Sequence, residues 1–172
     1  MLNNKAQAGG VYKVVCHDAD GNFKWEESTH NLVVNEGLQD MNTKYFSGSS
    51  YTAAWYLGLI TGPGSGTTIA AADTLASHSG WTEFTNYSGN RKAVTFGTAT
   101  TADPSVIDNS GSPSQFTISG AGGVVAGAFL CNAASGTSGV LFSASDFQSP
   151  GDRTVVSGDT LTVTYTFSLD AA

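Results

Sequence analysis

The clearest pattern in the chain is a strict alternation of apolar and polar residues from Leu161 to Leu169. The polar positions of this stretch carry hydroxyl groups and no charge; they are Thr162, Thr164, Thr166 and Ser168. A period of two predicts a strand with one face in a core and the other face outside it. A solvated strand face usually carries some lysine or glutamate, which also blocks unwanted pairing. We therefore predict that these four residues, the hydroxyl ladder, form a contact surface toward a neighbour within the molecule or in an assembly.

Two other stretches, Trp55–Ile60 and Val124–Cys131, are apolar on both faces. This is typical of central strands that are covered on both sides, so we expect the last strand to lie nearer the surface. Roughly ten short strands, separated by turns such as Asp20-Gly21, follow one another along the chain. This spacing predicts an all-β fold, an antiparallel β-sandwich of jelly-roll or immunoglobulin-like type.

One or two short helical insertions are also expected. Asn35 is suited to cap a helix whose apolar stripe would be Leu38, Met41 and Tyr45. The alanine-rich stretch from Ile69 to His78 predicts a second, shorter helix.

The first ten residues are polar and end in Gly9-Gly10. They predict a flexible N-terminal arm, either disordered or ordered on a partner, followed by a single sandwich domain over residues 11–172.

The charge balance and the apolar runs of the sequence limit the classes of partner that we expect. The 172 residues include 14 acidic and 7 basic side chains, which gives a net charge of −7. Direct binding to nucleic acid is not expected, because it needs a patch of lysine and arginine. The longest apolar run, Gly122 to Cys131, is about half of what a membrane span needs. Residues Met1–Ala6 lack the apolar segment of a secretory signal, so we expect synthesis in the cytoplasm.

Candidate metal ligands do not combine into a site in the sequence. Cys16 and His17 are adjacent on an expected strand and would point to opposite faces. Asp18 and Asp20 resemble the start of a calcium loop, but that loop would need glycine where Phe23 stands. The two cysteines, Cys16 and Cys131, lie in apolar strand-like stretches and predict buried free thiols rather than a disulfide.

No catalytic signature is found either. Asp73, Ser77 and His78 match a hydrolase set by residue type alone, because neighbours on a helix do not face each other and no nucleophile elbow is present. We expect a non-enzymatic protein without a cofactor.

Four large aromatic side chains offer two interpretations; they are Trp25, Trp55, Trp81 and Tyr87. They could form an exposed platform for stacking sugars, or they could belong to the core or an interface, which aromatic residues dominate.

One set of sequence features resembles a known group of proteins. It consists of Trp55-Tyr56-Leu57-Gly58-Leu59, the stretch from Ala72 to Glu83, Tyr87 and Arg91. In these features, and over about residues 11–169 as a whole, the chain resembles small virion proteins of tailed bacteriophages. The resemblance implies a structural part of the particle, such as a capsid decoration (cement) protein, a head fibre or a tail-associated protein. It carries over no catalytic residues.

The resemblance implies a decoration protein that binds the outside of the major capsid lattice and clamps neighbouring capsomers. Its partner would be the major capsid protein of the phage head, and it would be made in the host cytoplasm and located on the virion surface. A homodimer or a homotrimer would each suit a lattice. The alternative function is a tail-fibre or receptor-binding module that recognises host surface glycans through exposed aromatic residues.

Overall fold

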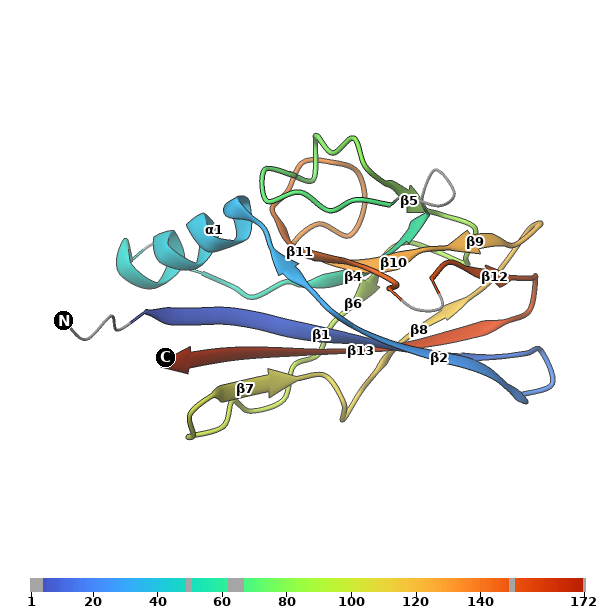
Figure 1. Cartoon of the computed structure of the whole chain (residues 1–172), viewed down its shortest axis with the longest axis horizontal. Helices are drawn as coiled ribbons and strands as arrows, with labels where there is room; N and C mark the ends of the chain where they lie inside the picture. The colour runs from blue at the N-terminus through green and yellow to red at the C-terminus, as the bar shows by residue number, and fades with distance from the viewer. Residues whose placement is uncertain (1–4, 49–50, 62–66, 149–150, 172) are drawn as a thin grey trace.

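The computed structural model describes residues 5–48, 51–61, 67–148 and 151–171, and within them the chain forms thirteen strands and one helix (Figure 1). The elements are β1 (Ala6–His17), β2 (Phe23–His30), β3 (Leu32–Val33), α1 (Asn35–Phe46), β4 (Tyr56–Thr61), β5 (Thr82–Phe84), β6 (Lys92–Ala93), β7 (Ser105–Asp108), β8 (Ser114–Thr117), β9 (Gly123–Val125), β10 (Gly127–Cys131), β11 (Leu141–Asp146), β12 (Arg153–Val155) and β13 (Thr160–Ala171).

Two antiparallel sheets pack face to face. The first has the order β2-β1-β13-β7, with β8 also paired to β13, and the second has the order β3-β11-β10-β4-β5, with β6 also paired to β4. A small third sheet joins β12 to β9. Side chains such as Val14 and Val163 of the first sheet share one core with Leu59 and Leu130 of the second. The predicted all-β antiparallel sandwich is therefore confirmed.

The last strand keeps its predicted alternation. Leu161, Val163 and Tyr165 are fully buried, and the intervening threonines are half-buried. Within its sheet β13 is central, with β1 on one side and β7 and β8 on the other (Figure 1). One face of this sheet is open, whereas β10 is buried on both faces, so β13 lies nearer the surface, as expected.

Most of the first doubly apolar stretch forms β4, and the second is divided between β9 and β10; β4 and β10 are central strands of the second sheet. The prediction was wrong for Val124, which lies in β9 and is 39% exposed. Every residue of β10 is buried. The inner face of this sheet contacts the sandwich core, and a second cluster that includes Ile60, Leu75, Trp81 and Phe129 covers its other face. Leu75 and Trp81 come from the segment between β4 and β5, which crosses the outside of the sheet in Figure 1.

The predicted N-terminal arm is in large part a strand. β1 begins at Ala6, and Ala6–Gly10 pair with Phe167–Ala171 of β13. Gly10 permits this pairing, because a side chain there would bring its Cβ atom within 2.6 Å of the Thr166 carbonyl oxygen. Residues 1–4 of the predicted arm lie outside the described residues.

Helix α1 forms where it was predicted but packs differently. Val34 occupies the N-cap position without a side-chain hydrogen bond, so the capping role predicted for Asn35 was wrong. Of the predicted apolar stripe, Met41 packs against the core, but the prediction was wrong for Leu38, which is 41% exposed, and for Tyr45, which is 81% exposed. The buried residue of the helix is Gly37, which lets the helix backbone lie directly on Phe142 of β11.

The second predicted helix, from Ile69 to His78, does not form, and this segment consists of turns and bends. Asp73 organises it, because one of its carboxylate oxygens accepts hydrogen bonds from the Ala70 amide and the Trp81 indole, both at 3.0 Å. The segment thus gains its order from tertiary hydrogen bonds and from burial of Trp81 rather than from a helical repeat.

Candidate functional site

The hydroxyl ladder lies on the outer face of the first sheet. Its four members face residues of β1 in register: Val15 opposite Thr162, Lys13 opposite Thr164, Val11 opposite Thr166 and Gly9 opposite Ser168. All four are half-buried, because strands flank β13 on both sides. The structure therefore brings the four predicted residues together on one open sheet face, and their role in a contact stays a prediction.

The sheet face around the ladder carries an ion pair that the sequence of β13 alone does not reveal. Lys13 Nζ lies 3.0 Å from a carboxylate oxygen of Glu26 on β2, and the two side chains are 50% and 44% exposed. A pair this exposed contributes at most about 1 kcal/mol to stability. Its two charges compensate each other, so the centre of the face stays electrically neutral beside Thr164.

A shallow hollow opens at one end of the ladder. It has a volume of about 270 Å³, and its lining includes Gly9, Gly10, His30, Thr166 and Ser168. Gly9 has no side chain to fill this space beside Ser168, whereas a side chain at Gly10 would point toward the buried Tyr165. Threonine and serine hydroxyls can each donate one hydrogen bond and accept two, so this surface can pair with polar groups of either kind. Because the four ladder residues carry no charge, a partner could cover them without removing a charged ladder side chain from water.

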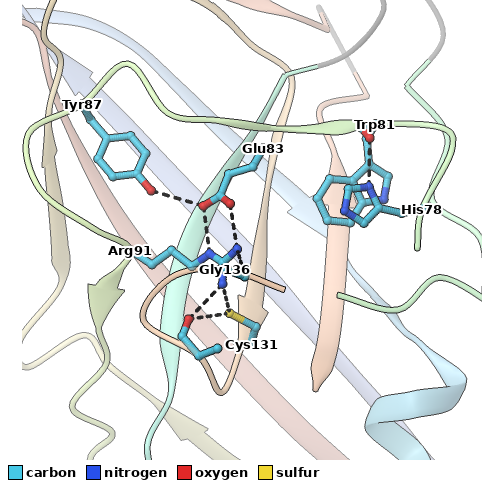
Figure 2. A network of polar contacts seen from close by, with 8 residues as sticks. His78, Trp81, Glu83, Tyr87, Arg91, Cys131 and Gly136 are labelled. Carbon is cyan, nitrogen blue, oxygen red and sulfur yellow. Dashed lines mark hydrogen bonds and ion pairs between the residues drawn. The ribbon is translucent and has the colours of Figure 1, made fainter. Parts of the chain in front are cut away.

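The most extensive network of side-chain contacts surrounds Arg91 (Figure 2). Its buried guanidinium binds Glu83 through both carboxylate oxygens, with Nε–Oε1 at 2.8 Å and Nη2–Oε2 at 2.7 Å. The remaining donors reach the carbonyl oxygens of Ala133 at 3.0 Å and Gly136 at 2.9 Å. Arg91 therefore fixes the turn between β10 and β11 against the strand β5, which is a structural role.

Sequence reasoning missed this network as a structural unit. Glu83 and Arg91 are eight residues apart on the two sides of the Gly89-Asn90 turn, and that spacing is the signal that could have paired them. The carbonyl partners carry no sequence signal, because any residue supplies a backbone carbonyl. Burial raises the pKa of the neighbouring Tyr87 well above its usual value.

Asp73, Ser77 and His78, which match a hydrolase by residue type, make other contacts in the structure. Asp73 binds the Trp81 indole, and His78 stacks on the Trp81 ring with centroids 3.6 Å apart. The Nδ1 atom of His78 lies 2.9 Å from the Trp81 carbonyl oxygen, as Figure 2 shows. The Ser77 amide donates to Thr74. The structure does not bring these three groups together as a nucleophile and its base.

The four aromatic residues that could have stacked sugars do not form an exposed platform. Trp25, Trp81 and Tyr87 are buried, and Trp55 is half-buried against Phe142. The core interpretation of these side chains is confirmed, and the glycan-stacking alternative loses the observation that motivated it.

Both cysteines are buried free thiols, as predicted. Burial, followed by the nearby charge of Asp159, raises the pKa of Cys16 to about 11. Burial also raises the pKa of Cys131. Both side chains therefore remain in the neutral thiol form at physiological pH.

The described residues include no cluster of three histidine, cysteine, aspartate or glutamate side chains that could hold a metal ion. The Asp18 carboxylate instead accepts hydrogen bonds from the backbone amides of Asp20 and Asn22, which closes the β1–β2 turn. The one helix described is too short and too polar to cross a membrane.

Comparison with known proteins adds no relative. No protein-family model, no curated protein and no solved structure matches this chain.

Proposed function

We propose that this protein is a non-enzymatic structural component of a bacteriophage virion, a capsid decoration protein that binds the outside of the major capsid lattice and stabilises it. The observation that carries the proposal is the hydroxyl ladder, an uncharged row of four side chains at the centre of an open sheet face. The sequence resemblance to small virion proteins supports the same assignment.

The ladder suits a contact that is repeated many times over a lattice. Each hydroxyl can exchange a hydrogen bond with water for one with a partner, which contributes about 0.5–1.5 kcal/mol. Four such contacts form only a modest interaction in one copy, but a homodimer or homotrimer would engage several capsid subunits at once. The partner is the major capsid protein, and the site of action is the virion surface after synthesis in the host cytoplasm.

The test uses the substitution Thr164→Lys at the middle of the ladder. The new ammonium group would have to be buried against the partner without a counter-ion, which is costly. We expect the variant to stay folded and its affinity for expanded capsids to fall at least about tenfold, measured by co-sedimentation. Cryo-electron microscopy of the decorated particle should place the outer face of the first sheet against the lattice.

A matched control is Thr154→Lys, which adds the same charge at an exposed strand position of β12. This variant should bind like the unmodified protein. If the unmodified protein does not bind capsids, the proposed function is wrong. If both variants bind equally well, the ladder is ordinary sheet surface and another face must make the contact.

A further inference from the structure

An apolar cavity opens at the end of the sandwich where α1 and β7 lie (Figure 1). It has a volume of about 190 Å³, and its lining includes Met41, Trp55, Phe96, Ile107 and Phe167. All of these side chains are half-buried rather than buried, so they face space that a ligand can enter. An apolar cavity of about 150 Å³ is large enough to hold a benzene ring. This cavity therefore has room for a small apolar group.

What this cavity chiefly offers to a ligand is apolar surface. Tyr165 also lines it, but the Tyr165 hydroxyl is already bonded to other side chains. It accepts a hydrogen bond from the Asn31 amide nitrogen at 2.9 Å, and the Ser143 hydroxyl lies 3.3 Å away. A group that enters the cavity would therefore be held by the removal of apolar surface from water.

A larger groove adjoins the cavity at Met41. It has a volume of about 620 Å³, and its lining includes residues of α1, Tyr51, and Leu169 of β13. Met41 lines both spaces, and its three rotatable bonds allow its side chain to move aside. Tyr45 and Phe46, which also line the groove, are 81% and 77% exposed, more than any other large apolar side chain in the described parts of the chain. Exposed apolar surface of this kind marks binding grooves in soluble proteins.

The groove also carries a positive charge. Lys44 is the one charged residue, among those that the structure describes, in the lining of either space. Its ammonium nitrogen lies 4.7 Å from the centroid of the Tyr51 ring and 4.0 Å from a carboxylate oxygen of Asp40. A separation of 4.0 Å is too long for a hydrogen bond, so the three donors of the ammonium group stay available to a closer acceptor.

These features together indicate the chemistry of the ligand. Apolar walls with a single charged group at one end suit a molecule that has an apolar body and an anionic head. A fatty acid has this form, since its unbranched chain can pass from the groove into the cavity beside Met41 while its carboxylate accepts hydrogen bonds from Lys44. A peptide would fit less well, because its backbone polar groups would lose water against walls that offer few partners.

We propose that the cavity and the groove form one site, the α1 acyl site, which binds a medium-chain fatty acid with its chain in the cavity and its carboxylate at Lys44. Tyr165, Phe167 and Leu169 contribute one face of β13 to this site, whereas the hydroxyl ladder occupies the other face of the same strand. The two sites are therefore separate, and the α1 acyl site does not depend on the proposed role on a capsid.

The test is a nuclear magnetic resonance titration of the full chain, labelled with ¹³C at the methionine methyl groups, with sodium decanoate below its micelle concentration. The chain has two methionines, so the Met41 signal is assigned by its loss in Met41→Leu. We expect a saturable shift of this signal. Octanoate, which is two methylenes shorter, should bind about tenfold more weakly. Decyltrimethylammonium, with the same chain length and the opposite head charge, should bind at least about fivefold more weakly than decanoate.

Variants separate the head of the site from its apolar walls. Lys44→Gln should weaken decanoate binding at least about fivefold and leave the binding of neutral decanol unchanged. Lys13→Gln makes the same change in charge on the outer face of the first sheet and should bind decanoate normally. Ile107→Trp fills the cavity and should weaken the binding of decanoate and decanol alike. If Ile107→Trp does not fold, the comparison of decanoate with decanol in Lys44→Gln still decides the matter.

The proposal is overturned if decanoate causes no saturable shift of the Met41 signal, or if decyltrimethylammonium binds as tightly as decanoate. It is equally overturned if the folded Lys44→Gln and Ile107→Trp variants retain full affinity. A Met41 signal that shifts when the protein alone is diluted would show that a second copy covers this face, which also overturns the proposal. None of these measurements uses capsids, so their failure is distinct from failure of the proposed function.

Discussion

At the scale of single residues, the buried ion pair between Arg91 and Glu83 should matter most for stability. Arg91 makes hydrogen bonds to Glu83, Ala133 and Gly136 and is 4% exposed at its side chain. Removing Arg91 would leave Glu83, whose side chain is 26% exposed, without its counter-ion, and would leave two carbonyl oxygens without their donor.

We expect Arg91→Ala to lower the free energy of unfolding by about 3–5 kcal/mol, measured by urea denaturation. Arg91→Lys should be only a partial substitute, since an ammonium cannot reproduce the two parallel bonds of the guanidinium. Lys13→Ala is the control, because the pair that it breaks with Glu26 is half exposed and should cost at most about 1 kcal/mol. A loss below 1 kcal/mol for Arg91→Ala would contradict the structural role of this network.

At the scale of elements, the contact between α1 and β11 depends on a missing side chain. A Cβ atom at Gly37 would lie 2.9 Å from the Cα atom of Phe142 and closer still to its carbonyl oxygen. Because both are backbone atoms, neither can move aside without shifting the strand.

Gly37→Ala therefore tests this packing by the sign of its effect. Alanine is favoured over glycine in a helix interior by about 1 kcal/mol, so the helix by itself would gain stability. We expect instead a net loss of about 1–3 kcal/mol from overpacking, measured as a fall in the midpoint of urea unfolding. Gly111→Ala, which has open space around it, should change stability little. Stabilisation by Gly37→Ala would show that the helix does not rest on β11 in this way.

The same helix shows where sequence reasoning reaches its limit. The alternation over Leu161–Leu169 was read correctly, because period-two burial depends on neighbours in one strand. The apolar stripe of α1 was misread, because a glycine contributes no hydrophobic signal even when it is the residue that packs. Likewise, Gly9 and Gly10 suggested a flexible arm, whereas both belong to β1, and the small size of Gly10 is what lets β1 pair closely with β13.

The sites also differ in how far the sequence alone could predict them. The hydroxyl ladder could be predicted because its four members come from one strand. The carbonyl oxygens that Arg91 binds belong instead to Ala133 and Gly136, which are 42 and 45 residues away along the chain. Only the tertiary fold brings them together, so no local pattern could have indicated them.

At the scale of the whole molecule, the hydroxyl ladder and the hollow at its end share the outer face of the first sheet. The lining of the hollow includes Thr166 and Ser168 of the ladder and His30 of β2. A partner that lies across this face would therefore contact both.

The pairing of β1 with β13 also determines how the fold would respond to mechanical force. These strands are antiparallel, with Ala6 opposite Ala171, so the two ends of the described chain lie side by side (Figure 1). A force pulling the ends apart would load the inter-strand hydrogen bonds one after another, as in unzipping. A force between Lys5 and Ser157, at opposite ends of the pair, would instead load them together in shear.

We therefore expect optical-tweezers measurements to give a much lower unfolding force for handles at Lys5 and Ala171 than for handles at Lys5 and Ser157. Equal forces would mean that the β1–β13 pair is not the element that resists. In the proposed decoration role, contacts spread along the face of the first sheet would therefore resist a pulling force better than a tether attached near Lys5 and Ala171.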